Sequence, residues 1–247
     1  MSALLLTALA CLAGPLPVAA PPSAELLGAL CPTGQVQGDA CGQCPSGGTA
    51  GKWTIGAALP GHFTAPDADE VALWLPSPDC ATTADEGGFF VLAVRAAGVW
   101  KGEATSGALR VDHCVALRGT DGRDRLACGR ERIDQSVTSS WIELDDAEDD
   151  PPSGEGVASA ATGLGGCEPP FGEAHIDPAI SLVVAKGRTE VVANATLAEG
   201  KVPSSYTCGD AVPFGPVQRL RLVFVWDGEQ LKPTPETATL MARFPKP

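Results

Sequence analysis

Short apolar runs recur along this chain and are bounded by Gly, Pro and Asp. In the run at 217–226, Leu220, Leu222 and Phe224 alternate with Arg219 and other residues, which predicts a half-buried strand because side chains of a strand alternate between its faces. Asp-Gly follows at 227–228 and is typical of a tight turn. The same criteria predict strands at 70–75, 89–96, 99–103, 114–118, 125–129, 139–144, 179–185, 189–196, 217–226 and 237–244.

Helical periodicity is scarce, and only 24–30 suits a short helix. Frequent short strands therefore predict an all-β fold of antiparallel strands, built either as propeller-blade-like hairpin units or as a β-sandwich. Hydrophobic residues make up 44% of the chain, which is enough to form a core. The 29 glycines and 22 prolines then belong to the turns between strands.

Residues 1–20 carry no charge and combine a short leucine-rich run with small residues at 18–20. This pattern predicts a secretory signal peptide with cleavage after Ala20. The apolar run is shorter than the roughly 20 residues that span a bilayer, so we expect no transmembrane segment after cleavage. The protein is expected to be exported, to the periplasm, the cell surface or the medium. Lipid attachment at Cys11 stays open as an alternative.

Cleavage leaves an even number of cysteines, and an even number in an exported chain predicts a set of disulfides. Cys41 and Cys44 form a C-x-x-C motif, which also suits a thiol oxidoreductase or half a zinc site. The loop-forming sequence Pro-Ser-Gly-Gly follows at 45–48, and no second C-x-x-C occurs, so a structural role is favoured. The eight predicted disulfide cysteines are Cys31, Cys41, Cys44, Cys80, Cys114, Cys128, Cys167 and Cys208.

An acidic run divides the chain. Six of the eight residues at 143–150 are acids, and Pro-Pro follows at 151–152, which predicts an exposed loop or linker. A calcium loop is disfavoured there because the D-x-D-x-D-G spacing is missing. The predicted organisation is a signal peptide at 1–20, a Cys/Gly-rich segment at 21–52, a β-domain at 53–145, an acidic Pro/Gly linker at 146–157 and a C-terminal β-region at 158–247, either separate or part of the same domain.

Two segments of the β-domain share a motif. The stretch at 61–73 resembles the G-D-F-x-x-D-G-x-x-D-[DE]-[LIV] unit of FG-GAP repeats in integrin-like β-propellers, and 120–126 is similar to the end of that unit. The resemblance covers about 53–145 and implies blade-like hairpins, with 89–100 as the hairpin that follows the first unit. The matching residues of the first unit are Gly61, Phe63, Asp69, Glu70, Val71 and Leu73.

In that family the aspartate-rich loop binds calcium, and only Asp121 and Asp124 carry over as candidate ligands. Gly119 stands where a first acid is expected, and Arg125 replaces another. Calcium takes six to eight oxygen ligands, so two carboxylates make a weak site. We therefore expect no cofactor, with calcium as the one candidate.

Candidate catalytic groups are few. The sequence has neither the G-x-S-x-G of α/β-hydrolases nor the H-E-x-x-H of zinc proteases. His113 follows Asp112, and His175 lies two residues before Asp177, so each histidine has an acid nearby. In an extended strand, neighbours point to opposite faces, whereas His175 and Asp177 would share one. A role as ordinary surface histidines is favoured over a catalytic or metal site.

The chain has 17 Lys and Arg against 30 Asp and Glu, a formal net charge of −13. This acidic balance argues against a nucleic-acid partner, since nucleic-acid-binding domains present a basic face. The Ala/Gly-rich, Arg-over-Lys composition suggests a bacterial source. Together these observations predict an exported, non-catalytic binding or accessory protein for an unknown protein or polymer. The alternative is a secreted hydrolase with a carboxylate or His site that forms no recognisable motif.

Overall fold

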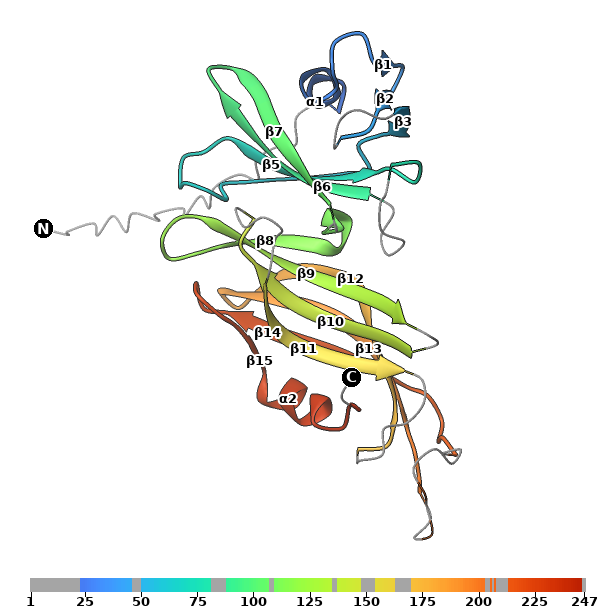
Figure 1. The fold of residues 1–247 in the computed structure, drawn as a ribbon. Helices are drawn as coiled ribbons and strands as arrows, with labels where there is room; N and C mark the ends of the chain where they lie inside the picture. Colours follow the sequence, from blue (N-terminus) through green and yellow to red (C-terminus); the bar gives the residue numbers. More distant parts are fainter. Residues whose placement is uncertain are drawn as a thin grey trace, which may run out of the picture.

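The computed structural model describes residues 23–45, 50–80, 88–106, 109–134, 137–147, 154–162, 170–202, 205, 207 and 213–245. The fold is all-β, as the sequence predicts, and four antiparallel sheets account for most of it (Figure 1). Helix α1 (Ser23–Leu30) lies where the sequence predicts a short helix at 24–30. The predicted signal peptide at 1–20, with Cys11, lies outside the described residues.

The three larger sheets are up-and-down meanders in which each strand pairs with its neighbour in the chain. Sheet A holds β1 (Val36–Gln37), β2 (Ala40–Gln43) and β3 (Ala50–Trp53), and sheet B holds β4 (Ala57–Gly61), β5 (Glu70–Pro76), β6 (Gly88–Ala96) and β7 (Val99–Ser106). Sheet C holds β8 (Cys114–Arg118), β9 (Asp124–Asp134), β10 (Val137–Asp145) and β11 (Gly154–Thr162). Sheet D holds β12 (Gly172–Ala185), β13 (Arg188–Glu199), β14 (Gln218–Trp226) and β15 (Leu231–Pro233).

Sheets C and D pack face to face as a sandwich and enclose the largest core. Sheet C contributes alternate residues such as Leu117, Ile142 and Ala160, and sheet D contributes Val191 and Phe224. The alternation predicted for 217–226 is confirmed, since Leu222, Phe224 and Trp226 are buried while Arg219 and Arg221 are exposed.

Sheet B is buried on both faces. Val71, Leu73 and Leu75 of β5 pack against α1 and sheet A, whereas Ala72 and Trp74 face the other way, toward the short 3-10 helix η1 (Val111–His113) and sheet C. A strand covered on both faces has no side exposed to solvent, which explains why the sequence of β5 is a nearly continuous apolar run and does not alternate between apolar and polar residues. Figure 1 shows the resulting stack, with sheet B above sheets C and D.

Three expectations about the C-terminal half are wrong. Residues 237–244, predicted as a strand, lie mainly in helix α2 (Pro235–Met241), which Thr234 caps by accepting a hydrogen bond from the Thr237 N–H. Strand β11 begins at Gly154, inside the segment 146–157 assigned to a linker. The acidic run is also not a continuous exposed loop, because Glu143 and Asp145 are buried in β10.

Three disulfides brace the described part of the chain. Cys31 pairs with Cys41, Cys44 with Cys80, and Cys114 with Cys128. The two cysteines of the C-x-x-C motif therefore have different partners and do not form the dithiol pair that an oxidoreductase needs. Cys167 and Cys208, also predicted to be disulfide-bonded, lie outside the described residues.

Within the part of the chain that the structure covers, no helix combines the length and apolar character needed to cross a bilayer.

Candidate functional site

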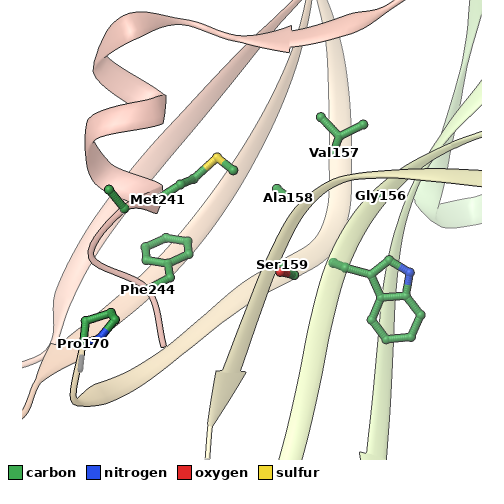
Figure 2. Close-up of a pocket in the computed structure, with 9 residues that line it drawn as sticks. Gly156, Val157, Ala158, Ser159, Pro170, Met241 and Phe244 are labelled. Atoms are coloured by element: carbon green, nitrogen blue, oxygen red, sulfur yellow. The ribbon is translucent and has the colours of Figure 1, made fainter. Parts of the chain in front are cut away.

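A groove of about 390 Å³ runs along β11, the outermost strand of sheet C (Figure 2). Its volume lies in the range typical of ligand sites. Its lining comes from β10, β11, the segment before β12 and the end of α2, and includes Trp141, Gly156, Val157, Ala158, Ser159, Pro170, Met241, Ala242 and Phe244.

The edge of β11 forms the middle of this groove. Ser159 is the register partner of Trp141 on β10, so both side chains lie on the outer face of sheet C. Ala158 points the other way, into the core that also contains Phe244. Figure 2 shows Met241, Phe244 and Pro170 on one side of the β11 ribbon. The groove thus has an apolar wall on each face of a strand edge.

Helix α2 supplies one wall, and the reason is local. Thr234-Pro235-Glu236 has an N-cap residue followed by proline at the first helical position, which starts a helix directly after β15. The Thr237 hydroxyl then accepts a hydrogen bond of 2.8 Å from the Val223 N–H and ties the helix to β14. This contact fixes the direction of α2, which carries Met241 to the groove.

Trp141 supplies the other wall and is held by a charged group. Its Nε1–H donates to Glu143 Oε2 over 2.9 Å, and Glu143 also forms an ion pair with Arg130 of β9. Arg130 lies 3.4 Å from Asp145 as well, so one guanidinium serves two buried carboxylates. Buried acids of this kind require a partner because desolvation is costly. The pair therefore fixes the orientation of the indole.

Among the residues that the structure describes, those that line the groove have no ionisable side chain, although the chain as a whole is acidic. Glu155, which is exposed, directly precedes the lining residue Gly156. The described part of the groove is therefore an uncharged, apolar surface in an acidic protein, and it suits apolar groups.

The two calcium candidates lie elsewhere and are each engaged by an arginine. Asp121 accepts hydrogen bonds from the backbone N–H of Arg123 (3.0 Å) and from its Nε (2.9 Å), which lowers the pKa of this carboxyl. Asp124 is 2.8 Å from Arg118 Nε and accepts a 2.8 Å bond from the His62 N–H. Among the described residues, no three His, Cys, Asp or Glu side chains gather in a way that would hold a metal ion.

The motif at 61–73 has a structural explanation. Glu70 is almost fully buried and accepts hydrogen bonds from the N–H groups of Phe63 and Thr64 and from the Thr64 hydroxyl. This carboxylate therefore shapes the loop that leads into β5. The likeness to propeller repeats stays a prediction.

The histidines do not gather at the groove. His113 lies in η1, where its Nε2 is 3.8 Å from Asp112, and not in an extended segment as the sequence reasoning assumed. His175 faces Glu131 of β9 at 2.5 Å and not Asp177, whose carboxylate accepts a bond from the Ala179 N–H.

No protein-family model, curated protein or solved structure matches this chain. The groove was not predicted, because β11 was missed and α2 was misassigned as a strand. The Thr-Pro-Glu signature at 234–236 is the signal by which the sequence could have indicated α2. Nothing comparable marks β11, whose residues are mostly Gly, Ala and Ser.

Proposed function

We propose that this chain is an exported, non-catalytic binding protein that holds an apolar segment of a partner protein in the groove between β11 and α2. The observation that carries the proposal is the groove itself, which has apolar walls on both faces of a strand edge and an uncharged lining as far as the structure describes it. Oxidised cysteine pairs persist outside the reducing cytosol, which supports export.

The alternative, a secreted hydrolase, has less support. Such an enzyme needs a histidine or a pair of carboxylates in a cleft, and none of the described residues that line the groove is His, Asp or Glu. His113 and His175 each face a single acid outside it.

The neutral dye Nile red tests whether the groove takes apolar groups. Ser159→Lys places a long charged side chain in the groove, whereas Ser181→Lys changes an exposed serine on β12 outside it. We expect the wild-type protein and Ser181→Lys to enhance dye fluorescence equally. Ser159→Lys should reduce the affinity for the dye by about tenfold or more, since a fully buried apolar group is worth roughly 1.5–3 kcal/mol.

Circular dichroism spectra of the two variants should match that of the wild type, which would exclude misfolding. Equal dye affinity in both variants, or no binding by the wild type, would contradict the proposed function.

A further inference from the structure

The groove follows a strand edge. Strand β11 pairs with β10 on one side, and among the described residues no backbone hydrogen bond reaches it from the other side. In an antiparallel ladder, alternate residues direct both N–H and C=O away from the paired strand. The outer edge of β11 therefore offers a row of donors and acceptors to an incoming strand.

The regular part of this edge is long enough to pair. The register between β10 and β11 shifts between Ile142 and Glu143, which leaves Val157 as a bulge, but it runs without interruption from Ala158 to Thr162. Side chains along this stretch are small, and Ser159 is exposed, so a second backbone can approach closely. The bulge interrupts the regular register, and pairing with β10 resumes at Gly156.

The position of the walls favours a strand over a compact ligand. Trp141 lies on the outer face of sheet C, and Phe244 lies on the inner face. A strand added to β11 would direct successive side chains to opposite faces, so alternate side chains would meet the two walls in turn. A compact apolar molecule would fill one side only and would leave the edge unpaired.

Charge defines the chemistry of the occupant. The described lining residues are uncharged, so a charged side chain of the segment that lies among them would be desolvated without a partner. Exposed Glu155 stands at the end of the groove, and the chain carries a net charge of −13. A basic residue at the end of the segment is complementary to this end and to the overall field of the protein.

We propose that the groove binds an extended segment of a partner protein by strand addition to β11, with an uncharged, apolar centre and Lys or Arg at its ends. This inference rests on the proposed function and specifies its partner. Main-chain hydrogen bonds to the edge provide affinity, and the two apolar walls select the side chains.

The test uses a fluorescein-labelled peptide, acetyl-Lys-Val-Ala-Leu-Ala-Val-Lys-amide, which is apolar on both faces of its centre, and two versions with methylated backbone nitrogens. One version is methylated at the Ala residues and the other at the Val and Leu residues, so each blocks one edge of the extended peptide. Fluorescence polarisation should show binding of the parent peptide. One methylated version should lose affinity by about tenfold or more, and the other should lose much less.

Hydrogen exchange provides an independent readout on the protein. When the parent peptide is bound, the amides of 158–162 that point outward should exchange at least about tenfold more slowly. Ser159→Lys should abolish both this protection and the binding of the peptide. Ser181→Lys should behave as the wild type. A peptide with Glu in place of both Lys residues should bind more weakly.

The outcomes separate the two claims. Strand addition is overturned if both methylated peptides bind as well as the parent, or if the parent fails to bind while Nile red still depends on Ser159; the apolar groove then stands. If the dye does not depend on Ser159 and no peptide binds, the proposed function falls together with the inference.

Discussion

Buried carboxylates organise this protein at the scale of single residues. Glu70 closes the 61–64 loop through backbone N–H groups, and Asp124 joins that loop to sheet C through His62. Glu143 holds the Trp141 indole beside the groove. In each case a carboxylate excluded from water is compensated by two or more donors, as a buried charge requires. The acids in these positions are therefore structural, and Asp124 also links two segments that are 62 residues apart in sequence.

Asp227 is the residue for which a pH effect is clearest. A hydrogen bond from Lys232, followed by the backbone N–H groups of Gln230 and Glu229, lowers its pKa to about 2. Because the pKa is lowered on folding, the ionised carboxylate stabilises the folded state above the unfolded pKa of about 3.8, and this contribution is lost as the pH falls toward 2.

We therefore expect Asp227→Ala to be less stable than the wild type at pH 6, with the difference shrinking between pH 4 and pH 2. Urea denaturation followed by tryptophan fluorescence at several pH values measures this. A difference that stays constant down to pH 2 would contradict the assignment. Asp67→Ala, which removes an exposed aspartate without an ion pair or side-chain hydrogen bond to another described residue, serves as the control.

At the scale of elements, strand β12 is the piece that closes the sandwich. The Ile176 N–H of β12 donates a hydrogen bond of 2.8 Å to the buried hydroxyl of Ser140 on β10. A side chain of sheet C therefore provides the hydrogen-bond partner of this backbone group. The pairing of β12 with β13 shifts between Ile176 and Ile180, and Pro178 lies in this irregular part. There the backbone of β12 approaches Gly129 of β9 so closely that a Cβ at that glycine would lie 2.1 Å from the Pro178 oxygen.

Gly129→Ala should therefore destabilise the protein, because neither backbone can yield without shifting a whole strand. Overpacking of this kind typically costs about 1–3 kcal/mol. Gly156→Ala is the matched control, since a Cβ there meets nothing within 4 Å. Chemical denaturation of both variants gives the comparison, and equal stabilities would show that β12 is not pressed against β9 as described.

The elements also show where sequence patterns succeed. Strands with β-branched or aromatic residues, such as β6 and β13, were predicted within a few residues of their ends. Strand β11 was missed because Gly, Ala and Ser have little strand preference, and its existence depends on pairing with β10. The segment 237–244 was misassigned because, over so short a length, its apolar spacing suits both a helix and a strand. The N-cap at Thr234 favours the helix that the structure has.

For the whole molecule, layering determines which surfaces remain free. Sheet B is covered on both faces, whereas sheets C and D cover only each other's inner faces, so sheet edges and parts of the outer faces of this sandwich are left for partners. One edge strand of sheet C, β11, is lined by apolar walls. The disulfides lie mainly in the upper part of the stack, where Cys31–Cys41 and Cys44–Cys80 brace the small sheet A and join it to the end of β5.

A prediction about oxidation state belongs to this scale. Protein recovered from the medium or periplasm should contain no free thiol among the eight cysteines after residue 20, because disulfides persist in an oxidising compartment. Mass spectrometry after alkylation, with and without prior reduction, measures this. Fully reduced protein serves as the control for complete labelling. Alkylation of two or more of these cysteines without reduction would contradict the disulfide framework.

The sequence by itself determined the fold class, the disulfide character and most strands, because alternation, turn residues and cysteine number are local properties of the chain. It also indicated that no common catalytic motif is present. Only the tertiary structure decided the groove. Its residues come from β10, β11 and α2, which meet through sheet pairing and packing and share no spacing along the chain. The same holds for Arg130, Glu143 and Trp141, whose contact depends on the register between β9 and β10.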